Sequence, residues 1–128
     1  MSNPSWALQV ALFERLSAAL TVPVFDAVES GTPYPYVTLD YEAVDNTSPI
    51  SGKKRESRLF YLSVWSDHQG QAEVKRINAE IAETLDEVKL PLSTGNAVSV
   101  RVIRTESNRD ADGITYMGSV TLRIITQH

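Results

Sequence analysis

The sequence predicts an α+β fold: a mainly antiparallel, mixed sheet of about five strands with two helices packed on it. Two segments, residues 5–20 and 71–87, repeat apolar residues at intervals of three and four, which is the periodicity of amphipathic helices. Other segments alternate in polarity or are continuously apolar, as strands do. The length of 128 residues and the hydrophobic fraction of 42% suit one domain with its own core. We therefore expect a single domain over residues 1–128, with the element order α-β-β-β-α-β-β.

The first element is a helix that begins at Asn3-Pro4 and ends near Leu20. Asn3 can cap it, and proline suits the first helical position because its missing N–H would be unpaired there. The apolar residues of this helix are Trp6, Leu8, Val10, Leu12, Phe13, Leu16 and Leu20. We interpret the whole stripe as facing the core. The alternative is that Trp6 and Phe13 form a partner-binding surface.

Two strands are predicted on either side of a proline-rich turn. Residues 22–28 form the first, with Pro23 at its start or on an edge. The sequence Pro33-Tyr34-Pro35-Tyr36 then leads into the second strand, which alternates in polarity from Tyr36 onward. The two prolines stiffen this entry. The side chains of Tyr34 and Tyr36 need a covering surface, which either the core or a neighbouring subunit could supply.

Residues 45–58 are predicted to form a long loop, since they combine Ser, Pro, Gly and basic residues without apolar periodicity beyond Ile50. Long loops in compact domains are often functional. The basic cluster consists of Lys53, Lys54, Arg55 and Arg58, on a chain of net charge −4. Contact with a neighbouring subunit or plain solvation is the favoured interpretation. Contact with a nucleic-acid backbone is the alternative.

The strand over residues 59–65 is apolar on both faces, so we predict that it is central and covered on both sides. The second helix follows over residues 71–87, with an acidic, solvated outer face. Strands over 97–105 and 114–126 then make a hairpin. Within the last strand, Gly118 indicates a bulge or a close contact.

The turn of this hairpin, Asn108 to Gly113, has oxygen-bearing side chains at alternate positions, like the first half of a calcium-binding loop. The twelfth position, counted from Asn108, is Ser119 instead of the required glutamate. We therefore interpret the segment as a polar turn. Its charged residues, Arg109, Asp110 and Asp112, are candidates for contacts between subunits.

No catalytic constellation emerges from the sequence, and we expect no enzyme activity, cofactor or metal. The chain has no cysteine, which excludes a thiol nucleophile, a disulfide framework, a thiolate zinc site and an iron–sulfur cluster. Ser66-Asp67-His68 contains the residue types of a catalytic triad, but adjacent residues cannot align as a relay. No glycine-rich phosphate-binding motif is present.

The charge and hydropathy of the chain limit the kinds of partner that we expect it to bind. Proteins that grip nucleic acid are usually basic, whereas this chain has a pI of about 5.1. An acidic surface suits a protein past which nucleic acid moves without being bound. The N-terminus does not resemble a secretory signal, and no apolar stretch approaches the roughly 18 residues that a membrane span needs. We expect a protein made in the cytoplasm, without a membrane partner.

Several short motifs occur in an order that resembles one known family. They are Val24-Phe25-Asp26, Pro33-Tyr34-Pro35-Tyr36-Val37, Leu62-Ser63-Val64-Trp65-Ser66, the helix from Gln71 to Leu85, and Gly118-Ser119-Val120-Thr121-Leu122-Arg123. Together with the leading helix they cover nearly the whole chain. This order resembles the tail completion, or tail terminator, proteins of long-tailed phages and gene transfer agents.

The resemblance implies a structural virion protein, assembled in the host cytoplasm and located at the head-proximal end of the tail. Such a subunit forms a ring of six copies that ends polymerisation of the tail tube and joins the tail to the head connector. The implied partners are other copies of the chain, the tail tube protein and the connector or stopper protein, with DNA passing through the lumen without specific binding. Loop 45–58 and the hairpin tip 106–113 would reach toward neighbours. A head-side stopper or adaptor, or a generic cytoplasmic binding module, remains the alternative.

Overall fold

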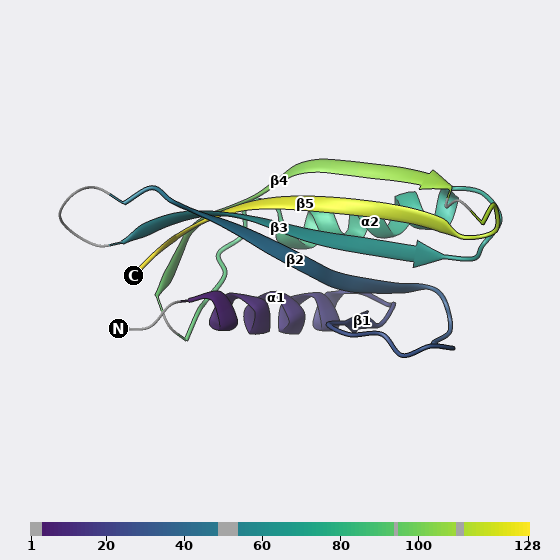
Figure 1. The fold of residues 1–128 in the computed structure, drawn as a ribbon, viewed down its shortest axis with the longest axis horizontal. Coiled ribbons are helices and arrows are strands. Elements are labelled where there is room, and N and C mark those ends of the chain that lie inside the picture. The colour runs from purple at the N-terminus through teal and green to yellow at the C-terminus, as the bar shows by residue number, and fades with distance from the viewer. Residues whose placement is uncertain (1–3, 49–53, 94, 110–111) are drawn as a thin grey trace.

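The computed structural model describes residues 4–48, 54–93, 95–109 and 112–128. Its elements follow the predicted order α-β-β-β-α-β-β. They are α1 (Ser5–Ala19), β1 (Val24–Phe25), β2 (Tyr36–Asn46), β3 (Arg55–Ser66), α2 (Ala72–Leu85), β4 (Asn96–Arg109) and β5 (Tyr116–Gln127) (Figure 1). The capping role predicted for Asn3 lies outside the described residues.

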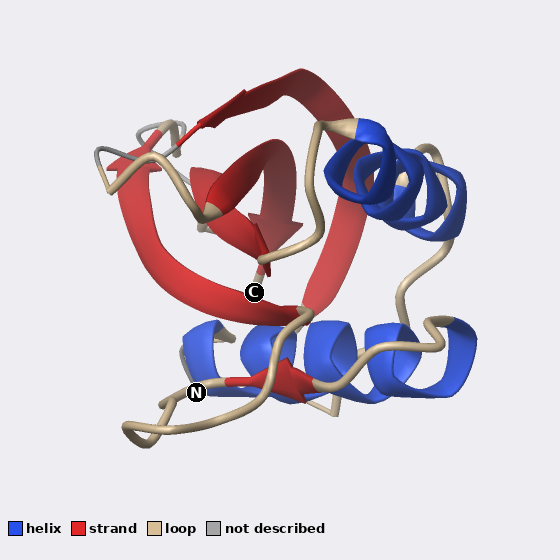
Figure 2. Ribbon diagram, turned by 90° about the vertical axis from the view of Figure 1, so that its right-hand side faces the viewer, coloured by secondary structure: helices blue, strands red, loops and turns tan. Residues whose placement is uncertain are grey.

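The five strands form one mixed sheet in the order β1-β2-β3-β5-β4. Among the described strands, β1 pairs in parallel with β2, and the other pairings are antiparallel. β3 is central, as predicted, because it pairs with β2 on one side and β5 on the other. Both helices pack on the same side of the strongly curved sheet (Figure 2). The α+β prediction is therefore confirmed.

The prediction that β3 is covered on both sides is wrong for the part of the chain that the structure describes. Phe60, Leu62 and Val64 are buried under the helices. Leu59, Tyr61 and Trp65 point to the opposite face, where no described helix packs, and they are only half-buried. Apolar residues on both faces of a strand therefore did not mean two covering layers here.

The core lies between the two helices and the sheet, and leucines spaced four apart form the α1 side of it. Leu8, Leu12 and Leu16 are fully buried with Ile77, Ile81 and Leu85 of α2 in one apolar cluster. Trp6 is 69% exposed and Phe13 is 38% exposed, so the prediction that both face the core is wrong. A helix turns about 100° per residue, and the leucine row leaves these two rings on the other side of α1.

β2 and β3 extend into the segment 45–58 that was predicted as a loop, which leaves only residues 47–54 between them. Backbone bonds hold the base of this connection: Thr47 N donates to the Arg55 carbonyl, and Lys54 and His128 exchange two N–H···O bonds, all at 2.9 Å. Ladder hydrogen bonds join backbone groups, so the polar sequence of this region did not reveal them. β4 likewise continues to Arg109, beyond its predicted end.

Gly118 marks a close approach of α2 to β5. A Cβ atom at Gly118 would lie 2.6 Å from Val74 Cγ1 and 2.6 Å from Asn78 Oδ1. The pairing of β5 with β3 runs through Gly118 without a register shift, so the glycine marks a contact and not a bulge. The Asn78 amide continues this contact by donating to the Glu106 carbonyl at 2.8 Å.

Candidate functional site

The proline-flanked tyrosines form an aromatic cluster at the start of β2. The rings of Tyr34 and Tyr36 stack with centroids 5.2 Å apart, and Phe25 meets Tyr36 edge-on at 5.9 Å. The Tyr34–Pro35 peptide bond is cis. Partial burial, together with the neighbouring Tyr34 hydroxyl, raises the pKa of Tyr36 above its usual value. Tyr34 remains 38% exposed, so the cluster is available to a neighbouring molecule.

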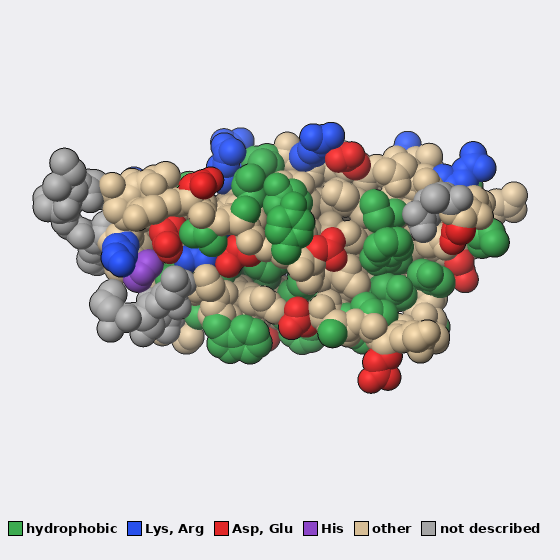
Figure 3. All heavy atoms as spheres, viewed as in Figure 1, with side chains coloured by type: hydrophobic (Ala, Val, Ile, Leu, Met, Phe, Trp, Pro, Cys, Tyr) green, Lys and Arg blue, Asp and Glu red, His purple; other side chains and the backbone are tan. Residues whose placement is uncertain are grey.

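A second aromatic group lies on the helix-free face of the sheet. Tyr41 and Tyr61 stack with centroids 4.3 Å apart, and Tyr41 is 60% exposed. Desolvation and a hydrogen bond with Tyr61 raise the pKa of Tyr41 above its usual value. Figure 3 views this face and shows apolar side chains grouped over its middle, with Lys and Arg side chains along the upper rim. Sequence reasoning missed this surface, although the second apolar face of β3 was its signal.

A polar group lies beside these rings. The Asp40 carboxylate accepts a hydrogen bond from the Thr38 hydroxyl at 2.8 Å and a very short one from the Ser63 hydroxyl. The Trp65 indole N–H donates to the Thr38 hydroxyl at 3.3 Å. Each polar group here is therefore paired within the sheet, which fixes the orientation of Trp65 on the helix-free face.

Arg58, predicted to lie on a loop and contact a neighbouring subunit, is fully buried inside the chain. Its guanidinium contacts the carboxylates of Glu42, at 3.1 Å, and Glu56, at 2.6 Å. It also donates to the hydroxyls of Ser5, at 2.5 Å, and Thr126, at 2.9 Å. Because β3 begins at Arg55, Arg58 points to the core face of the sheet. It ties α1, β2, β3 and β5 together and is not available to a neighbour.

The other predicted contact residues fall into two groups at opposite ends of the long axis (Figure 1). Lys54 and Arg55 are exposed where β3 begins. Tyr34, Tyr36 and Arg109 lie at the other end, where β2 begins and β4 ends. Ile50, Lys53 and Asp110 lie outside the described residues.

Asp112 organises the turn between β4 and β5. Its carboxylate accepts hydrogen bonds from the backbone N–H groups of Thr115 and Ile114, each at 2.8 Å, and from the Thr115 hydroxyl at 2.7 Å. These bonds hold the pKa of Asp112 below its usual value, because they favour the charged carboxylate. These hydrogen bonds support the interpretation of this segment as a polar turn, and the Asp112 side chain remains exposed.

The Ser66-Asp67-His68 segment is a structural lead-in to α2. The Ser66 hydroxyl donates to Glu73 at 2.5 Å and accepts from the His68 backbone N–H at 3.0 Å. Within the described residues, no group of three or more His, Asp or Glu side chains is placed to hold a metal ion. Neither described helix is long and apolar enough to cross a membrane.

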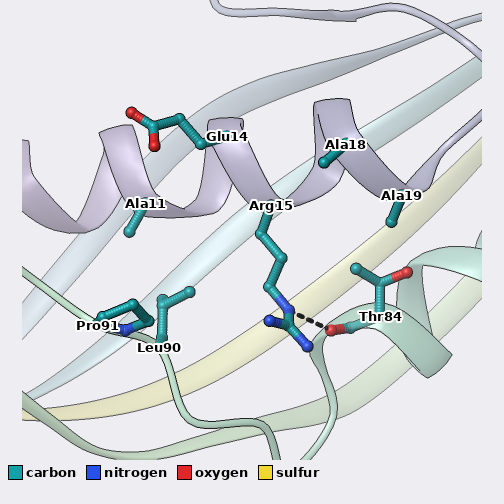
Figure 4. Close-up of a pocket in the computed structure, with 8 residues that line it drawn as sticks. All are labelled: Ala11, Glu14, Arg15, Ala18, Ala19, Thr84, Leu90 and Pro91. Carbon is teal, nitrogen blue, oxygen red and sulfur yellow. Dashed lines mark hydrogen bonds between the residues drawn. The ribbon is translucent and has the colours of Figure 1, made fainter.

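A hollow of about 570 Å³ lies between α1, the end of α2 and the segment before β4 (Figure 4). Small alanines of α1 line one side, and Leu90 and Pro91 line the other. Arg15 crosses it and donates from Nε to the Thr84 carbonyl at 2.8 Å. That hydrogen bond links the two helices, so the Arg15 guanidinium in this hollow stabilises their packing.

Comparison with known proteins identifies the family of this chain. No curated protein matches the chain. A chain of a solved structure described as the virion of a native gene transfer agent particle matches with a TM-score of 0.88 and 25% sequence identity, over 100% of both chains. The family described as tail completion protein gp17 matches residues 9–127. The chain therefore belongs to the tail completion protein gp17 family.

Proposed function

We propose that this protein is a tail terminator, which forms a six-membered ring on the head-proximal end of the tail tube, ends tube polymerisation and joins the tail to the head connector. Family membership makes the chain a structural protein of the virion tail. The observation that carries the finer proposal is the full-length match to a chain of an assembled gene transfer agent virion. DNA passes through the lumen without specific binding, in keeping with a net charge of −4.

The two groups of exposed residues support a subunit that joins two different neighbours. Lys54 and Arg55 present positive charge at one end of the long axis, and the Tyr34–Tyr36 stack with Arg109 lies at the other. A terminator needs two such ends, because one must meet the tube and the other the connector. We assign no catalytic step to either group.

Electron microscopy of the protein mixed with its tail tube protein tests this function. Tubes capped at one end by a six-fold ring are the expected result. Uncapped tubes beside free subunits would instead favour a head-side stopper or adaptor, and binding to the portal or adaptor protein would then identify it.

The role of the basic end is tested with the double variant Lys54→Glu and Arg55→Glu. Both side chains are exposed, so the variant should keep its far-ultraviolet circular dichroism spectrum. It should fail either to cap tubes or to join them to heads. The matched control is Lys75→Glu with Arg76→Glu, which reverses two exposed charges on α2. Normal joining by the first variant would remove Lys54 and Arg55 from the proposal.

A further inference from the structure

We propose that the outer side of α1 in one subunit docks on the helix-free sheet face of a second copy of this chain, and that this contact repeats around the ring. The inference rests on the proposed function and specifies which surfaces the copies use. The first surface is the α1 groove, formed by Trp6, Val10 and Phe13 with its neighbours. The second is the aromatic-arginine surface, formed by Tyr41, Leu59, Tyr61, Arg101 and Arg123.

The α1 groove is an apolar hollow of about 350 Å³ beside β1. Trp6 is 69% exposed and Phe13 is 38% exposed, although aromatic side chains of this size gain about 1.5–3 kcal/mol or more when they are fully buried. Adjacent exposed aromatic residues are typical of a surface that another protein covers.

The charged residues that line the α1 groove are both acidic. They are Glu14 on α1 and Asp26 just after β1. Both are exposed, and neither forms an ion pair with any residue that the structure describes. A partner of the groove should therefore combine an apolar surface with two positive charges.

The aromatic-arginine surface has this combination. Register partners across the sheet place Leu59, Arg123 and Arg101 in one row. The neighbouring row contains the stacked pair of Tyr41 and Tyr61. Apolar and aromatic side chains therefore lie directly beside two arginines on the helix-free face.

Among the residues that the structure describes, the two arginines have no negatively charged partner. Arg101 and Arg123 are directly opposite one another on β4 and β5, an arrangement in which like charges repel. Neither forms an ion pair with a described residue, and the nearby Arg104 is paired with Glu106 at 2.9 Å. Two carboxylates placed against Arg101 and Arg123 would relieve this repulsion.

The two surfaces carry opposite charges and are both apolar, so they are complementary. This complementarity selects a second copy of the chain as the partner. Within the described part of the chain, one surface offers apolar rings with two carboxylates that form no ion pair, and the other offers apolar rings with two guanidinium groups that form none. The two surfaces are different, so the contact is head-to-tail, the type that generates closed rings. A DNA phosphate backbone could neutralise the arginines, but it would leave the groove and its acidic residues uncovered.

The cysteine-free chain allows a direct cross-linking test. The double variant Phe13→Cys and Tyr61→Cys is mixed with tail tube protein and treated with a short bismaleimide. Because the sheet separates the two positions within one chain, a cross-link must join two copies. We expect a ladder of covalent multimers that ends at the ring size. The matched control, Glu83→Cys with Tyr61→Cys, moves one thiol to the exposed side of α2 and should give no ladder.

The outcomes distinguish the proposed contact between subunits from the proposed terminator function. Capped tubes without a ladder would overturn this contact and leave the terminator function standing. A ladder without capped tubes would support the contact and overturn the terminator. Neither caps nor a ladder would overturn both. If the Phe13→Cys chain fails to fold, Trp6→Cys replaces it, since Trp6 is the more exposed residue.

Charge reversal tests the electrostatic part. Arg101→Glu with Arg123→Glu should reduce the ladder at least tenfold, and adding Glu14→Arg with Asp26→Arg should restore it. An unchanged ladder in the first variant, with weaker retention of duplex DNA, would overturn the charge match in favour of a DNA contact. An unchanged ladder with unchanged DNA retention would overturn any role for the two arginines.

Discussion

Replacing Arg58 by methionine should destabilise the protein strongly, although no exposed surface changes. The Arg58 side chain is fully buried, and its guanidinium contacts Glu42 at 3.1 Å and Glu56 at 2.6 Å. It also donates to the hydroxyls of Ser5 and Thr126. Methionine keeps much of the volume and removes every one of these bonds.

The expected loss follows from how exposed the abandoned groups are. Removing one partner of a buried ion pair lowers the free energy of unfolding by about 3–5 kcal/mol. The Glu42 and Glu56 side chains are 19% and 15% exposed, so they can recover part of their hydration. We therefore expect a loss near the lower limit, about 3 kcal/mol. The individual bonds act as one unit and are not summed.

Urea unfolding followed by circular dichroism measures this loss. The transition midpoint should fall while the slope m is retained, because the surface exposed on unfolding changes little. Arg101→Met is the matched control, since Arg101 is exposed, and it should change stability by no more than about 0.5 kcal/mol. A loss below about 1 kcal/mol for Arg58→Met would refute the reasoning, because the buried network would then contribute no net stability.

Three further predictions concern the core, the α2 contact and the β4–β5 turn. Leu12→Ala should lower the free energy of unfolding by about 2–5 kcal/mol, whereas Trp6→Ala should lower it by less than about 1 kcal/mol, as measured by urea unfolding. Gly118→Ala should cost about 1–3 kcal/mol because its Cβ would overlap Asn78, and an unchanged melting temperature would contradict this. The Asp112 carboxyl should titrate below its usual range by NMR. Since the pKa of Asp112 is lower in the folded state, its contribution to stability is present above the unfolded-state pKa and is lost as pH falls through the folded-state pKa. Lower hydrogen-exchange protection factors at the turn would report this loss. A normal Asp112 titration would contradict this.

The elements and their order could be predicted because each depends on local periodicity. The three- and four-residue spacing of α2 and the alternation in the strands determine secondary structure before any long-range contact forms. The close contact at Gly118 was also recognisable, because glycine within a strand often marks a tight approach. The family resemblance rested on motifs in this same order, and the family match over residues 9–127 confirms it.

The candidate surfaces could not be predicted in the same way, because they depend on which face of an element meets another. α1 has apolar residues on more than one side, and only packing against α2 and the sheet selected the leucine row and left Trp6 exposed. Arg58 was assigned to a loop because its neighbours are polar, yet backbone pairing carried β3 to Arg55 and turned the guanidinium inward.

The sequence by itself therefore determined the secondary structure, its order and the family of this protein, since these follow from patterns within short stretches of chain. Only the tertiary structure decided which apolar and charged side chains are left without a partner. Arg101 and Arg123 are distant in sequence and become neighbours through the register of β4 with β5. The physical reason is that the burial and pairing of a side chain are properties of two or more segments together, and no single segment contains them.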